Sequence, residues 1–216
     1  MQIKADLHVH TTYSSDSLIT PKDLVFYAIK AGLNAVAVTD HNSLDGAFKI
    51  AKENNFLIIP GMEVSSSDGH IVALNVKELI PRGLNAEETV ERIHRAGGVA
   101  IACHPFAMFK GSLKGKISAS FDAIEVINAR ASPYGRSVKK AKKTAERFKL
   151  PCVAGTDAHF GPQIGYGYTV IEADKMSVES ALKAIVAGRC EPFGKPVPLT
   201  MNLAMEFARI RRMLQK

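Results

Sequence analysis

The alternation of short apolar runs with amphipathic segments constrains the fold of this chain more than any other feature of its sequence. Seven runs rich in Val, Ile and Ala have the length and composition of buried β-strands. They cover residues 3–9, 34–40, 56–63, 70–76, 98–104, 121–128 and 150–157. Strands that alternate with helices favour a parallel sheet covered on both faces. About seven such repeats in a single domain predict an α/β protein with a closed or nearly closed barrel.

Five segments between these runs have apolar side chains at helical spacing and predict α-helices. They cover residues 20–32, 43–55, 85–98, 134–149 and 177–188. In the first of them Thr20 is a suitable N-cap, Pro21 fits the first turn and Gly32 is a stop signal. Residues 106–121 lack periodicity and contain several Gly, Ser and Lys residues. We therefore expect a loop or a short helix there, over one end of the barrel.

The last segment, residues 200–216, has an apolar stripe at helical spacing and basic residues elsewhere. The stripe consists of Leu203, Phe207, Ile210 and Leu214. We predict that residues 1–199 form the barrel domain and that residues 200–216 form an amphipathic helix packed on its outside. A contact with a second copy of the chain or with nucleic acid is the alternative use of this helix.

Composition sets limits on the class of protein. With 216 residues, 46% of them hydrophobic and 23% charged, the chain resembles an ordinary soluble domain with a substantial core. No apolar run is long enough to cross a bilayer and the first residues lack a signal peptide, so we expect a cytoplasmic protein without a membrane partner. The three scattered cysteines are expected to be buried, reduced thiols. The net charge of +7 favours anionic partners such as phosphates or nucleic acid.

Polar side chains follow the ends of most of the predicted strands. In the first strand Asp6, His8 and His10 alternate with apolar residues, so we expect the three to share one face. The other polar residues near strand ends are Asp16, Asp40, His41, Glu63, His70, His104, Asp157 and His159. In a parallel barrel the carboxyl ends of all strands surround one mouth. Six of the seven histidines are therefore expected to converge there, with only His94 placed elsewhere, in the middle of a helix.

Such a cluster needs a chemical reason, because burying so many polar groups without partners is costly. Neutral imidazoles and carboxylates together are typical ligands of Zn, Mn or Fe. The candidate positions include no cysteine, which argues against a structural thiolate site. The number of candidate ligands exceeds what one tetrahedral ion needs. The sequence therefore predicts a cluster of metal ions at the mouth of the barrel.

The motifs at these positions resemble those of the PHP (polymerase and histidinol phosphatase) superfamily of metal-dependent phosphoesterases. They are "DLHVHTTYSSDS", "TDHNS", "GMEVSS", "HIVAL", "CHPF", "IEVINAR" and "GTDAH", in the order of that family, and they extend from about residue 6 to residue 159. The resemblance implies a distorted, TIM-like (β/α)7 barrel of seven strands. It also implies three divalent metal ions, Zn, Mn or Fe, and hydrolysis of phosphate esters.

Carried over position by position, the resemblance implies nine ligands in three sets. These sets are His8, His10, Glu63 and Asp157; Glu63 as a bridge with His70 and His104; and Asp16, His41 and His159. Asp6 and Asp40 are expected to hydrogen-bond the ligating imidazoles and to fix their tautomers.

The resemblance also implies a mechanism in which a hydroxide bridging two metal ions attacks phosphorus. Glu63, Asp157 and His159 are then the catalytic residues, and either His159 or a metal-bound water protonates the leaving group. Arg130 and Arg136 are candidates for binding phosphate.

The interval between His104 and Asp157 is too short for a large cap domain, so we expect an open mouth. The expected partners are a small phosphorylated substrate, such as a nucleotide, or a short oligonucleotide. Two alternatives stay open, an amidohydrolase-like metal-dependent hydrolase and a non-catalytic PHP-like subunit that binds nucleic acid. The sequence predicts no oligomeric state.

Overall fold

All seven predicted strands are present in the computed structural model, which describes residues 1–53, 55–108 and 111–214. They are β1 (Gln2–Val9), β2 (Ala35–Val38), β3 (Leu57–Ser65), β4 (His70–Leu74), β5 (Val99–Ala102), β6 (Ala123–Asn128) and β7 (Cys152–Gly155). Every residue of β2 and β6 is buried, as expected for strands covered on both faces.

Two further strands, β8 (Gly167–Glu172) and β9 (Cys190–Gly194), extend the sheet to nine strands in the order β7-β6-β5-β4-β3-β2-β1-β8-β9. The count of seven is therefore wrong for this sheet, although the α/β class and the barrel-like form are confirmed. β9 has the sequence CEPFG and is largely exposed, so it lacks the apolar pattern by which the other strands were predicted.

Strand direction explains how the mouth of the barrel forms. β1, β2 and β3 are parallel to one another, as are β5, β6 and β7, whereas β4 is antiparallel to both of its neighbours. The first residue of β4, His70, therefore lies at the same end as the last residues of β3 and β5. The sheet curls until β7 meets β8 and β9, where Ala154 N donates to Thr169 Oγ1 at 2.9 Å and Cys190 Sγ donates to Cys152 O at 3.5 Å. The result is a nearly closed barrel.

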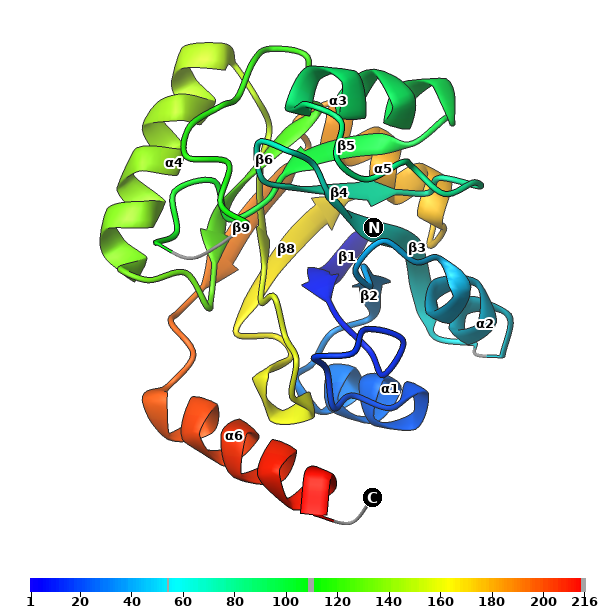
Figure 1. The fold of residues 1–216 in the computed structure, drawn as a ribbon. Helices are drawn as coiled ribbons and strands as arrows, with labels where there is room; N and C mark the ends of the chain where they lie inside the picture. The colour runs from blue at the N-terminus through cyan, green and yellow to red at the C-terminus, as the bar shows by residue number, and fades with distance from the viewer. Residues whose placement is uncertain (54, 109–110, 215–216) are drawn as a thin grey trace.

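The five predicted helices are α1 (Pro21–Lys30), α2 (Asp45–Glu53), α3 (Ala86–Arg95), α4 (Tyr134–Phe148) and α5 (Val178–Val186), and they lie around the curled sheet (Figure 1). Thr20 caps α1 as expected, because its hydroxyl accepts from Asp23 N at 3.2 Å. Residues 106–108 and 111–121 form a loop, and residues 109 and 110 of that predicted segment lie outside the described residues. None of the helices in the described ranges is long and apolar enough to span a membrane.

The last helix, α6 (Leu199–Leu214), uses a different face from the one predicted. The stripe expected to pack on the barrel is in solvent, with Phe207 72% exposed and Leu214 83% exposed. The face opposite contacts the barrel, where Met205 is buried, Arg209 donates to Asp16 O and Arg212 donates to Ser17 O. Apolar residues lie on both faces of α6, so periodicity alone could not decide which of them packs. Figure 1 shows α6 beyond the end of the sheet, joined to it by a short connection.

Candidate metal centre

The mouth of the barrel brings together all nine predicted metal ligands. They come from the end of β1, the loops after β1, β2, β5 and β7, the interior of β3 and the start of β4. Eight residues line a cleft of about 290 Å³, and they are Asp16, His41, Glu63, His70, His104, Arg130, Asp157 and His159. His8 and His10 lie beneath them and are buried. The backbone is unusual at two of these positions, since His104 and Asp157 have positive φ angles of 31° and 61°.

A bulge in β1 corrects the prediction that Asp6, His8 and His10 share one face. Asp6 is in register with Val36 and Val9 with Val38, so β1 contains one more residue than β2 over this stretch. After the bulge His8 and His10 face Glu63, whereas Asp6 faces the backbone of Thr156 and Gly165. Simple alternation cannot reveal such an insertion.

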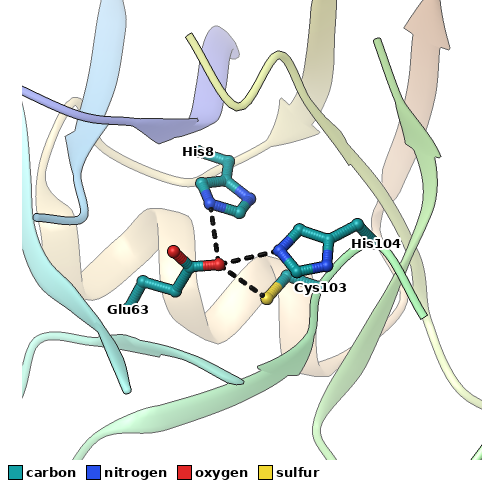
Figure 2. A group of neighbouring side chains, drawn as sticks. All are labelled: His8, Glu63, Cys103 and His104. Atoms are coloured by element: carbon teal, nitrogen blue, oxygen red, sulfur yellow. Dashed lines mark hydrogen bonds and ion pairs between the residues drawn. The ribbon is translucent and has the colours of Figure 1, made fainter. Parts of the chain in front are cut away.

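Glu63 is the centre of the cluster. Its carboxylate is 1% exposed and has five imidazoles around it. The distances from its oxygens are 2.8 Å to His104 Nε2, 2.8 Å to His41 Nδ1, 3.1 Å to His70 Nδ1, 3.4 Å to His8 Nε2 and 3.5 Å to His10 Nε2. Figure 2 shows His8, Cys103 and His104 around this carboxylate. A single anion that reaches both sides of the cluster is suited to bridging two cations.

Two aspartates complete the predicted sets. Asp157 Oδ1 lies 3.5 Å from His10 Nε2 and 3.8 Å from His8 Nε2. Asp16 Oδ2 lies 3.0 Å from His159 Nε2 and 3.4 Å from His41 Nε2. The residues of each predicted set are therefore neighbours. The structure also groups His10, His41 and His159 within 4.8 Å of one another, which links the first set to the third.

The imidazoles of His8 and His10 test whether metal ions fit here. Within the described part of the chain, the Nε2 atoms of both are buried and have no hydrogen-bond partner. Nδ1 of His8 is held by Glu125 Oε1 at 3.2 Å, so its Nε2 is directed at the cluster. Burial lowers the pKa of His10 to about 3, which keeps that imidazole neutral. Buried nitrogen lone pairs directed at carboxylates fit a divalent cation between them.

The pKa shifts of the site residues in the metal-free protein also favour cation binding at this cluster. Burial alone would raise the pKa of Glu63, but His8 and the hydrogen-bonding imidazoles outweigh it and hold that pKa well below its usual range. Burial opposes protonation of His41, but hydrogen bonds to Asp16 and Glu63 raise its pKa to about 10. The pKa of His8 is raised by the Glu125, Asp157 and Glu63 carboxylates in spite of its burial. Without metal, the site therefore holds protons where cations would bind.

The roles predicted for Asp6 and Asp40 need correction, because the hydrogen bonds described for their carboxylates go to no imidazole. Asp6 accepts from the backbone amides of His8, Thr156 and Gly165, and burial raises its pKa to about 6. Asp40 accepts from Thr11 N, Thr11 Oγ1 and Ser14 Oγ. Both carboxylates therefore fix the backbone and loops that present the ligands.

The tautomer-fixing contact comes instead from residues to which the sequence assigned no such role. Glu125, at the end of β6, holds His8 Nδ1 and accepts from His104 N at 2.7 Å. Ser14 lies 3.4 Å from His10 Nδ1 and connects it to Asp40. The position of Glu125 at a strand end was the available signal for its role, whereas a serine in a loop gives none.

Cys103 lies beside the cluster, 3.5 Å from Glu63 Oε1. Burial and the neighbouring carboxylates raise the pKa of its thiol, so it donates as a neutral group. All three cysteines are free, and Cys103 is buried as predicted, but Cys152 and Cys190 are half-buried. Three scattered positions in the sequence gave no indication that one thiol would adjoin the cluster.

The two predicted phosphate-binding arginines lie in different places. Arg130 lines the cleft, and its Nη1 is 3.0 Å from Asp157 O and 2.5 Å from His159 Nδ1. Arg136 is exposed on the first turn of α4 and is not among the residues that line the cleft. A distance of six residues along the chain is enough to separate them, because α4 begins at Tyr134 and leads away from the mouth.

The fold is a barrel-like α/β sheet, and histidines and carboxylates gather at its mouth. These two features place the protein in the class of barrel-like α/β proteins with a candidate multi-metal centre. The chain belongs to the PHP family. The family model described as "PHP domain" matches residues 6–132, and one described as "PHP-associated" matches residues 135–190. The resemblance noted in the motifs is thereby confirmed.

Individual relatives cover most of the chain. An uncharacterised protein of Methanocaldococcus jannaschii is 38% identical over 141 residues, which is 59% of this chain and 82% of that protein. The 5′-3′ exoribonuclease Rnm of Salmonella typhimurium is 30% identical over 84% of this chain and 64% of the enzyme. Among solved structures, a two-domain Bacteroides vulgatus protein with a predicted PHP-like metal-dependent phosphoesterase matches with a TM-score of 0.71 and 20% identity, over 90% of this chain and 65% of that one. This last likeness concerns the fold alone.

Proposed function

We propose that this protein is a metal-dependent phosphoesterase that hydrolyses phosphate esters, with nucleotides or short oligonucleotides as its substrates. The observation that supports this most is the convergence of six imidazoles and three carboxylates on one cleft, with the buried Nε2 atoms of His8 and His10 directed into it. A guanidinium, Arg130, lies on the same cleft and suits a phosphoryl group.

The proposed holders of three divalent ions, Zn, Mn or Fe, are the three sets described above, with Glu63 shared between two of them. Bound ions of this kind supply a water of lowered pKa as nucleophile and neutralise phosphoryl oxygens. In this scheme Glu63 and Asp157 provide the negative charge that binds the ions. Their burial, 1% and 6% exposed, strengthens that attraction because little water screens it.

The remaining cleft residues would position the substrate and one of the ions. Arg130 is partly exposed, so its guanidinium can bind a phosphoryl oxygen while Nη1 still donates to Asp157 O. His159 Nδ1 lies 2.5 Å from Arg130 Nη1 and 2.9 Å from Asp157 O, so its Nε2, 3.0 Å from Asp16 Oδ2, is the nitrogen that would hold an ion of the third set.

Two observations favour nucleotides or oligonucleotides among phosphate esters. One relative that covers most of the chain is named as a 5′-3′ exoribonuclease. The net charge of +7 also gives the protein a field that attracts polyanions, although several of its carboxylates are gathered in the cleft.

The test is hydrolysis of a generic phosphomonoester and a phosphodiester by the Mn-loaded protein. We expect turnover that disappears with a chelator and in His8→Ala. His94→Ala is the matched control, because His94 lies on α3 and pairs with Asp122 at 2.8 Å, away from the cleft. No turnover of either ester by protein shown to contain its metals would contradict the proposal and favour the non-catalytic alternative. A metal content of one or two ions per chain would favour the amidohydrolase-like alternative instead.

A further inference from the structure

A groove of about 1020 Å³ lies beside the metal cleft, and its lining residues other than His70 have no part in the chemistry proposed above. His70 lines both spaces, so the groove opens onto the cleft at a predicted metal ligand. The turn at residues 65–70 forms one wall. Described residues of the loop that follows β5, together with Lys140 of α4, form the other.

Close backbone contacts between the two walls fix the groove in position relative to His70. His70 N donates to Gly111 O at 2.7 Å. A Cβ on Gly111 would lie 2.5 Å from the His70 ring, and one on Gly69 would lie 2.7 Å from the backbone of Leu113. Both glycines have positive φ angles, so the two walls meet at a close approach that larger residues would not permit. A ligand in the groove is therefore held at a fixed position relative to His70.

The charge on the groove is positive. Lys114, Lys116 and Lys140 line it, and all three are exposed. Asp68 is the one carboxylate among the described lining residues, and it is paired with Lys116 at 2.5 Å. Lys114 and Lys140 are therefore left without a carboxylate partner within the described groove. Such lysines suit an anion that extends along the groove.

Apolar surface lies between these charges. Phe106 is half-buried, with its backbone carbonyl held by Ser137 Oγ at 3.1 Å, and Lys140 Nζ lies 5.7 Å from its ring centre. Met108 is 75% exposed. A positively charged groove with an aromatic ring and other apolar surface matches the way proteins hold single-stranded nucleic acid, with phosphates on the lysines and bases on the apolar groups.

We propose that this groove binds the nucleotides that flank the scissile phosphate of a single-stranded oligonucleotide. This inference rests on the proposed function, which places the scissile phosphate in the cleft. The cleft volume of about 290 Å³ is near the lower end for ligand pockets, so it has little room for neighbouring nucleotides. The groove, about three and a half times as large in volume, adjoins the cleft at His70.

The test is binding of a fluorescein-labelled single-stranded RNA to metal-free protein, followed by fluorescence anisotropy at several salt concentrations. Each phosphate contact to a single strand contributes about 0.7 to the slope of log affinity against log salt. Lys114→Ala/Lys140→Ala is therefore expected to lower that slope by about 1.4 and the affinity at 0.1 M salt by about 25-fold. The matched control is Lys142→Ala/Lys183→Ala, which removes the same charge from exposed lysines outside the groove.

A second variant works in the opposite direction. Asp68→Asn removes the charge that pairs Lys116 and makes a third lysine available, so affinity should rise by about fivefold at 0.1 M salt. An equal loss of affinity in the groove and control variants would overturn the inference, because only net charge would then matter. Tighter binding of a duplex of the same sequence would overturn the single-strand assignment.

Because this assay needs no turnover, its outcome is separate from that of the proposed function. Groove-dependent binding by a protein that hydrolyses no ester would support the groove as a site for single-stranded nucleic acid and would remove the proposed function. Hydrolysis of RNA by a protein whose groove variants bind as tightly as the wild type would do the reverse.

Discussion

Replacing Glu63 with Gln is the sharpest test of the metal centre, because it removes one negative charge and keeps the shape of the side chain. The ligand atoms of His41, Glu63 and His70 lie within 4.8 Å of one another, as do those of His8, Glu63, Cys103 and His104. A unit charge about 4 Å from another contributes about 4 kcal/mol at an effective dielectric constant near 20. For each ion next to Glu63 we therefore expect the dissociation constant to rise by at least about 10³-fold.

Competition with a chromophoric chelator measures these dissociation constants, and elemental analysis after dialysis gives the number of ions retained. Glu87→Gln is the matched control, since Glu87 is exposed on α3 and is not among the residues that line the cleft. Circular dichroism of the metal-free variants shows whether the fold is intact. A folded Glu63→Gln protein that retains the same ions with unchanged affinity would refute the assignment of Glu63 as a bridging ligand.

Three further outcomes follow from the structure. Asp6→Ala leaves three backbone amides without an acceptor and should lower the free energy of unfolding by about 3 kcal/mol in urea titrations, whereas Asp6→Asn, which keeps one oxygen, should cost less. Because the folded-state pKa values of His8 and His41 are raised, full metal loading at pH 7 should release about two protons per chain, and metal affinity should fall as pH falls. Calorimetry in buffers of different ionisation enthalpy measures the number of protons released, and a release of zero would contradict this prediction. Burial raises the pKa of Cys152, and it raises that of Cys190 to about 11. Both thiols should therefore resist iodoacetamide at pH 8 and react faster as the pH rises towards 11. Mass spectrometry follows the alkylation, and rapid reaction at pH 8 would contradict this prediction.

Much of the architecture could be predicted because it depends on patterns that are local in the sequence. The first seven strands are dense in buried aliphatic residues, and α1 has its Thr20 cap and an apolar face. β9 contains Pro192 and is mostly exposed, and it is held in place by pairing with β8, which no local pattern reveals. The antiparallel direction of β4 was not predicted either, although it explains why His70, at the start of a strand, lies at the mouth.

The candidate site divides in a similar way. Its members could be predicted, because polar residues at strand ends have few other reasons to be buried. The partners of those members could not, because the bulge in β1 reverses the side to which Asp6 points. Contacts such as that of Glu125 with His8, 117 positions apart, depend on the completed sheet. The position of Arg136 could not be predicted either, because its proximity to Arg130 in the sequence did not indicate that it lies on α4, outside the cleft.

The residues of the site are spread along the chain from residue 8 to residue 159. Asp6 accepts a hydrogen bond from Thr156, 150 positions further on, and Asp16 contacts His159 across 143 positions. Loops of this size close at a cost in chain entropy that must be met before the contacts form, so these pairings belong to the late steps of folding. During synthesis on the ribosome, the cluster cannot assemble until residue 159 has emerged. Ions bound there would act as cross-links that restrict the unfolded chain. Metal uptake would therefore report that the segment after β1 has docked against the segment after β7.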